Sequence, residues 1–146
     1  MVDNFDVPRE LSANGANDSS ARTAVNWGMT PAPLRHVRDR ITRADLVLQA
    51  KTGFGDMIKA VVDLERRSMV VGGELHSDEE AMLLDDGSTQ SNLWGINLYP
   101  GDRGEGFIEF DSMINVRPAQ GNPSRDVADG SIRDRIRAVV TQLVAE

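Results

Sequence analysis

The sequence has 146 residues, of which 40% are hydrophobic and 27% are charged, and its formal net charge is −7. It contains no cysteine, which excludes disulfides, thiolate metal sites and cysteine nucleophiles. The N-terminus lacks the basic start and apolar run of a signal peptide, and no stretch approaches the roughly 20 apolar residues of a membrane span. We therefore expect one soluble, cytoplasmic domain without direct membrane insertion.

The acidic excess lies in residues 41–146. This part holds eighteen acidic and eleven basic side chains, whereas residues 1–40 hold five of each. Binding to nucleic-acid phosphates requires clustered Lys and Arg side chains. We therefore expect no nucleic-acid partner, and the ordinary meaning of such a charge is solubility.

Residues 1–33 are predicted to form a flexible N-terminal arm. The stretch 11–23 is polar and cannot bury enough surface to offset the entropy of ordering. An apolar cluster beside prolines then forms a candidate docking peptide for a protein partner. The alternative is a plain tail with one patch that folds back on the domain. The candidate partner-binding residues are Trp27, Met29, Pro31, Pro33 and Leu34.

Residues 34–146 are predicted to form a single α+β domain. Thr42 is a predicted helix N-cap with Asp45 at the third helical position, and Gly53 is a predicted helix end. Two stretches rich in β-branched residues, 57–64 and 69–71, are joined by a charged link, which indicates a β-hairpin.

The second half of the domain is predicted to alternate a short helix, strands and a final helix. Acidic residues from Asp78 onward suit the first turn of a helix that ends at Asp86-Gly87. Residues 93–99 indicate a third strand, and residues 107–117 indicate one long or two short strands. Ser131 is the predicted cap of the last helix, whose apolar residues recur at helical spacing: Ile132, Ile136, Val139, Val140 and Leu143.

Consecutive strands with short links favour a mainly antiparallel sheet of four or five strands, with the helices packed on one face. The pattern predicts two longer helices and one short helix.

Several blocks of the domain resemble a small bacterial family of uncharacterised proteins, which is catalogued only as a domain of unknown function. The resemblance covers roughly residues 41–145 and leaves out the arm. It implies one compact domain and no assigned activity. The blocks that carry it are Asp63, Gly72-Gly73-Glu74-Leu75-His76, Leu93-Trp94-Gly95-Ile96-Asn97, Ile114-Asn115-Val116-Arg117-Pro118 and Gly121-Asn122.

Polar residues gather where the predicted strands end. Because strand side chains alternate between two faces, some of these residues are expected to share a face or a pocket. The catalytic candidates are Glu74, His76, Asp111 and Arg117, and the ligand-binding candidates are Asn97, Tyr99, Asn115, Arg117 and Asn122.

Two roles are open for each of the main candidates. His76 is either a general base oriented by Glu74 or Asp111, or a surface residue without a chemical role. Arg117 either binds a carboxylate or phosphate, or forms an internal ion pair that pins the last loop. The spacing Glu-x-His-x-Asp would also suit a divalent metal, but we expect no metal site and no cofactor.

Three functions remain open from the sequence. The first is an interaction module or accessory subunit that docks through its arm on a protein partner. The second is a small hydrolase or lyase, and the third is an anion or small-molecule binder, both using the polar pocket. The absence of a recognisable catalytic motif favours the first, and whether the protein is an enzyme stays undecided.

Overall fold

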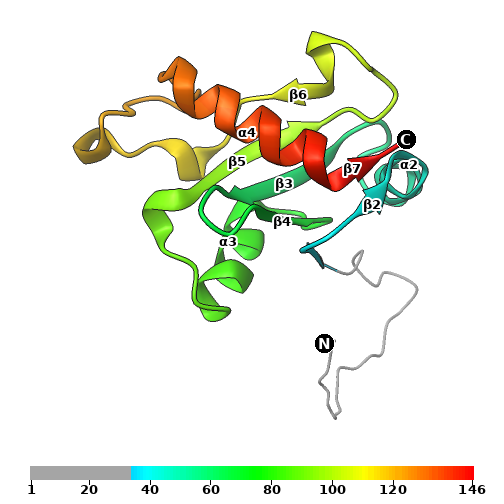
Figure 1. Ribbon diagram of the computed structural model, residues 1–146, viewed down its shortest axis with the longest axis horizontal. Coiled ribbons are helices and arrows are strands. Elements are labelled where there is room, and N and C mark those ends of the chain that lie inside the picture. Colours follow the sequence, from blue (N-terminus) through cyan, green and yellow to red (C-terminus); the bar gives the residue numbers. More distant parts are fainter. Residues whose placement is uncertain (1–33) are drawn as a thin grey trace. The chain divides into compact units, whose positions relative to one another are not determined.

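The structure is a computed structural model that describes residues 34–146 (Figure 1). Four of the predicted partner-binding residues, Trp27, Met29, Pro31 and Pro33, lie outside the described residues. Leu34 is half-buried at the start of the described part and packs against a cluster of apolar side chains.

The domain is built on a five-stranded antiparallel sheet, which confirms the predicted α+β class. The strand order is β1-β4-β3-β5-β6, and a separate parallel pair joins β2 to β7. The strands are β1 (Arg35–Val37), β2 (Ile41–Thr42), β3 (Ile58–Asp63), β4 (Ser68–Val71), β5 (Leu93–Leu98), β6 (Ile108–Glu109) and β7 (Val144–Ala145). The helices are α2 (Arg43–Thr52), α3 (His76–Asp85) and α4 (Gly130–Leu143), with 3-10 turns at Gln90–Asn92, Glu105–Phe107, Met113–Asn115 and Pro118–Gln120.

The predicted hairpin is confirmed as β3 and β4. Asp63 pairs with Ser68 at its end. One carboxylate oxygen of Asp63 accepts hydrogen bonds from the backbone amides of Glu65 at 2.9 Å and Arg66 at 3.0 Å. This Asx-type turn explains why a charged link closes the hairpin.

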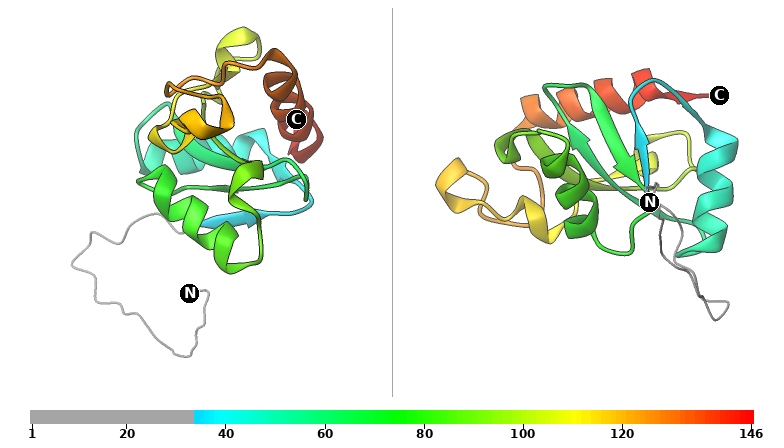
Figure 2. Two further views of the ribbon diagram at one scale, coloured as in Figure 1. Left: turned by 90° about the vertical axis from the view of Figure 1, so that its left-hand side faces the viewer. Right: turned by 90° about the horizontal axis from the view of Figure 1, so that it is seen from below.

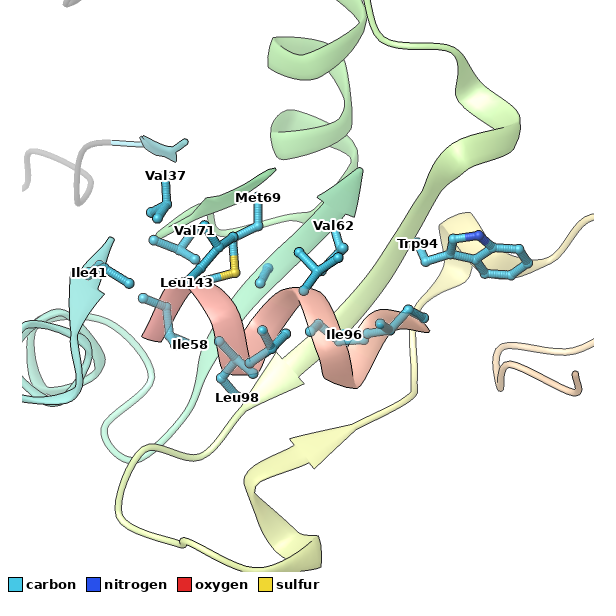
Figure 3. Close-up of a cluster of buried hydrophobic side chains, with 14 of the residues drawn as sticks. Val37, Ile41, Ile58, Val62, Met69, Val71, Trp94, Ile96, Leu98 and Leu143 are labelled. Carbon is cyan, nitrogen blue, oxygen red and sulfur yellow. The ribbon is translucent and has the colours of Figure 1, made fainter. Parts of the chain in front are cut away.

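Helices cover both faces of the sheet, so the predicted packing on one face is wrong. Alternate residues of β3 belong to two separate apolar clusters. Ala60 and Val62 face α4 and α2, whereas Val61 faces Leu83 of α3. Figure 2 shows α3 and α4 on opposite sides of the sheet, and Figure 3 shows the larger cluster beside α4. A central strand buried on both faces reads as a continuous apolar run rather than an alternation.

Two helix caps show how far local sequence sets the helix starts. The Thr42 hydroxyl accepts a hydrogen bond from the Asp45 amide at 3.0 Å, which confirms the predicted cap of α2. The cap of α4 is Asp129 rather than the predicted Ser131, because the Asp129 carboxylate accepts from both the amide and the hydroxyl of Ser131 at 2.8 Å. These bonds lower the pKa of Asp129 and favour its charged form at the helix start.

The predicted strand over residues 107–117 is wrong beyond Glu109. Only Ile108 and Glu109 pair with β5. Further along β5, the side chain of Asn115 takes the place of a strand: its amide donates to the Gly95 carbonyl at 2.9 Å and its oxygen accepts from the Gly95 amide at 2.8 Å. A Cβ on Gly95 would lie 2.5 Å from the Ser112 side chain, so only glycine permits this approach.

Strand β2 and the start of α2 meet the last residues of the chain described, β7 and Glu146, at one corner of the domain. Strand β2 pairs with β7, and Arg43 at the start of α2 bonds to Glu146 at 3.1 Å and to the Pro100 carbonyl at 2.9 Å. The Arg43 guanidinium also lies 4.3 Å from the ring centroid of Phe107. Within residues 34–146, no helix has the length and apolar content needed to cross a bilayer.

Replacing Ile136 with alanine should destabilise the domain. Ile136 is completely buried in the cluster beneath α4, and truncating such a side chain loses burial and leaves a cavity, which costs about 2–4 kcal/mol. Urea denaturation measures the loss. The matched control is Arg135→Ala on the exposed side of α4, which should change the free energy of unfolding by less than about 0.5 kcal/mol. Equal midpoints for Ile136→Ala and the wild type would show that α4 does not close this core.

Candidate functional site

Arg117 is engaged in holding backbone segments together. Its guanidinium donates to the carbonyls of Ile114 at 3.1 Å, Gln90 at 2.8 Å and Leu93, and it stacks 4.3 Å above the ring of Trp94. Among the described side chains it forms no ion pair, so the predicted internal ion pair is wrong; Asp111 pairs with Arg125 instead. Carbonyl oxygens, not a carboxylate, pin the loop.

The two loop asparagines are likewise occupied by the protein itself. Besides its bonds to Gly95, Asn115 donates to the Arg125 carbonyl at 3.1 Å. The amide nitrogen of Asn122 donates to three carbonyls, including that of Asn115 at 2.7 Å, and its oxygen accepts from the Ala128 amide at 2.8 Å. These amides organise the loop before α4, and their donors are not free for a ligand.

Glu74 and Asp111 have no contact in common. Glu74 is exposed and forms no hydrogen bond or ion pair with any residue from 34 to 146. Asp111 pairs with Arg125 at 2.6 Å, and the charges of both lie within range of His76. Of the four catalytic candidates, the structure therefore brings only His76 and Asp111 into one neighbourhood.

His76 is buried rather than exposed, so the expectation of a surface residue is wrong. It is the first residue of α3, is 8% exposed, and places Nε2 2.8 Å from the Ile96 carbonyl oxygen. Because a carbonyl only accepts, Nε2 carries the proton, and Nδ1 is the lone-pair nitrogen of the neutral ring. Burial lowers the pKa of His76, and the bond to Ile96 opposes this effect. Nδ1 has no hydrogen-bond partner within residues 34–146.

Glu79 lies three residues further along α3 and is completely buried. Its Oε2 accepts a hydrogen bond from the Gly73 amide at 2.8 Å, while its Oε1 is buried without a partner. Burial raises the pKa of Glu79 well above its ordinary value, and the Gly73 bond only partly offsets this. Burial therefore favours the protonated carboxyl group, in which Oε1 is the oxygen available to carry the proton.

Lys59 and Asn97 lie opposite these two residues on the sheet, directly paired across β3 and β5. The Asn97 amide nitrogen donates to Glu109 at 2.9 Å and to the Asp111 carbonyl at 3.3 Å, whereas its oxygen is buried without a partner. The Lys59 ammonium lies 5.2 Å from the ring centroid of Phe54 and forms no ion pair within the described part of the chain.

Lys59, His76, Glu79 and Asn97 line the interface between α3 and the sheet, and we call these four side chains the polar centre. The charge of Lys59 lies within range of both His76 and Glu79. Residues three apart on a helix lie about 5–6 Å from each other, and opposed residues on antiparallel strands lie about 4.5–5.5 Å apart. The bond from His76 to Ile96, the neighbour of Asn97, connects the two pairs. The rest of the interface under α3 is apolar: Val61, Val70, Leu83 and Leu93.

A shallow depression lies beside Tyr99, which follows Asn97 by two positions in the chain. It has a volume of about 350 Å³ and is lined by Asp56, Tyr99, Gly101, Asp102 and Gly106. The Tyr99 hydroxyl donates to Glu109 at 3.2 Å, the same carboxylate that holds Asn97. Desolvation and the charge of Glu109 raise the pKa of Tyr99. Within residues 34–146, no three His, Asp or Glu side chains are placed to hold a metal ion.

Sequence reasoning missed Lys59 and Glu79. Lys59 interrupts the apolar residues of 57–62, and a charged residue inside such a run is the signal that could have identified it. Glu79 stands among three consecutive acidic residues, and its spacing from His76 and Leu83 places it on the inner face of the helix.

The chain matches a known protein family. The sequence model of a family described as "Protein of unknown function (DUF5674)" matches residues 35–143, and the chain belongs to this family. No curated protein and no solved structure matches the chain.

Proposed function

We propose that this member of the DUF5674 family binds a small polar molecule at the polar centre between α3 and the sheet. The observation that supports this most strongly is a pair of buried oxygens, Glu79 Oε1 and Asn97 Oδ1, that have no hydrogen-bond partner. Buried polar atoms without partners are rare in folded proteins, because each costs the free energy of desolvation without repayment. Here two of them lie in one small region.

The side chains of the polar centre are also held in place in advance. His76 is fixed by the Ile96 carbonyl, Glu79 by the Gly73 amide, and Asn97 by Glu109. Each of these three side chains thus has one polar atom tied to the protein and one left over. Fixed groups of this type lose little conformational entropy on binding, which is the arrangement expected of a binding site.

The interaction module proposed from the sequence has a different basis. Its docking peptide consists of Trp27, Met29, Pro31, Pro33 and Leu34, of which the structure describes only Leu34. Partner binding through the arm therefore stays a prediction, and so do the absence of a nucleic-acid partner and the cytoplasmic location.

Nuclear magnetic resonance of the ¹⁵N-labelled full chain tests the proposed binding site. The probes are acetate, acetamide, glycolate, glycine and inorganic phosphate, added singly. We expect at least one probe to shift the Asn97 side-chain amide and the Gly73 backbone amide until saturation, because the first belongs to the polar centre and the second donates to Glu79.

The matched variants use the two histidines of the chain. His76→Gln should lose the response, whereas His36→Gln should retain it, since His36 lies beside Ser68 in a different part of the sheet. The unfolding midpoint shows that each variant is folded. The proposed function is wrong if none of the probes shifts these resonances, or if His76→Gln responds as the wild type does.

A further inference from the structure

We infer that the molecule bound at the polar centre is a small carboxylate that bears a hydroxyl or amino group on the neighbouring carbon. This inference rests on the proposed binding site and names the chemical class of its ligand. It follows from the number and type of polar atoms that the protein leaves without partners.

Two groups of the polar centre are suited to hold a carboxylate. The Lys59 ammonium provides a positive charge and three donors, and no acidic side chain within residues 34–146 pairs with it. Glu79 Oε1, buried and without a partner, provides a further donor when the carboxyl group is protonated. A ligand carboxylate would accept from both and would supply the negative charge that Lys59 lacks.

Two other groups are suited to a donor on the ligand. Nδ1 of His76 is the lone-pair nitrogen of its ring, because Nε2 donates to Ile96. Oδ1 of Asn97 has no partner, whereas the amide nitrogen of the same side chain already donates to two acceptors, Glu109 and the Asp111 carbonyl. Both atoms only accept, so the ligand must bring an O–H or N–H group to them.

The spacing of the four side chains fits a compact ligand. His76 and Glu79 lie three positions apart on α3, and Lys59 and Asn97 are directly paired across β3 and β5, so the Cβ atoms within each of these two pairs are about 5 Å apart. A hydroxyl or amino group on the carbon next to the carboxylate keeps the two functions within that span.

The surrounding charges leave the polar centre able to take an anion. Asp111 forms an ion pair with Arg125 at 2.6 Å, and the Glu109 carboxylate accepts hydrogen bonds from Asn97 and Tyr99. A bare metal ion fits less well, because the Lys59 ammonium stands among the four side chains and repels it.

Dissociation constants for the full chain test the inference with glycolate, glycine, acetate and acetamide as probes. Glycolate or glycine should bind at least about ten-fold more tightly than acetate, which lacks the second group, and than acetamide, which lacks the charge. Lys59→Met should weaken glycolate binding about ten- to hundred-fold, the loss expected for a charged hydrogen bond. Lys59→Arg, which keeps the charge, should restore part of the affinity.

The chain offers one matched control, since Lys51 is its other lysine and is exposed on α2. Lys51→Met should leave the affinity within about two-fold. If Lys59→Met does not fold, Lys59→Gln replaces it. Saturable binding of acetamide as tight as that of glycolate would leave the binding site intact and overturn the carboxylate class, as would unchanged affinity in Lys59→Met. Failure of every probe would overturn the proposed function as well.

Discussion

Asn115→Ala should lower the free energy of unfolding by about 3–5 kcal/mol. The substitution removes the partner of the Gly95 amide, of the Gly95 carbonyl and of the Arg125 carbonyl. Asn115 is completely buried, so water cannot take its place easily. Each unsatisfied buried group costs about 1–3 kcal/mol, and urea denaturation measures the total.

A second variant separates the lost hydrogen bonds from the lost volume. Asn115→Asp keeps the size of the side chain but sets an acceptor against the Gly95 carbonyl, so it should also be strongly destabilising. Asn92→Ala is the control, because the side-chain amide of Asn92 bonds only to the exposed Glu65. This substitution should lower the free energy of unfolding by less than about 1 kcal/mol. If Asn115→Ala and the wild type unfold at the same urea concentration, the Asn115 side chain does not serve as the missing strand.

Glu79→Gln should stabilise the protein at high pH in the absence of ligand. Burial raises the pKa of Glu79 in the folded state above its value in the unfolded chain. The contribution of this carboxyl group to stability is therefore complete below the unfolded pKa and is lost as the pH rises toward the folded pKa. Glutamine does not titrate and still accepts from the Gly73 amide.

The advantage of Glu79→Gln should therefore grow from pH 5 to pH 8, by at most about 1.4 kcal/mol per pH unit. Urea denaturation of both proteins at several pH values gives the difference, in which the titration of the two histidines cancels. Glu74→Gln is the control for the removal of a carboxylate from α3 and its approach, since Glu74 is exposed. A constant difference for Glu79→Gln would show that the carboxyl group is ionised in the folded protein.

Much of the fold could be predicted because its signals are local. The cap at Thr42, the hairpin closed at Asp63 and the strand at Leu93–Leu98 each depend on a few adjacent residues. Strands β1, β2 and β7 have only three or two residues, and so short a segment carries no periodic pattern. They exist because of partners far along the chain.

The two errors about the sheet have different physical causes. Residues 107–117 have the composition of a strand, but Asn115 bonds to Gly95 through its side chain, and tertiary contacts override local preference there. The second error, helices on one face of the sheet, could have been avoided from the sequence of β3. Ala60 to Val62 is an uninterrupted apolar run, which is typical of a strand buried on both faces.

Most of the sequence blocks that carry the family resemblance contain residues that hold the fold together, and few of their residues belong to the polar centre. Gly95, Asn115, Arg117 and Asn122 bond to backbone groups and hold the loops around β5. Only His76 and Asn97 belong to both the blocks and the polar centre. Lys59 and Glu79 lie outside these blocks, and the packing of α3 on the sheet makes them candidates for the proposed site.

The corner where β2 meets β7 also determines when the domain can form during protein synthesis. Arg43 and Glu146, which bond there, are separated by 103 positions. All five strands of the main sheet precede residue 110, yet four of the buried side chains that cover its larger apolar face, Ile136, Val139, Val140 and Leu143, come from α4. A ribosome therefore produces the whole sheet with this face uncovered, and the domain closes only after residues 130–146 have emerged. The nascent chain should consequently need protection from aggregation until α4 has emerged.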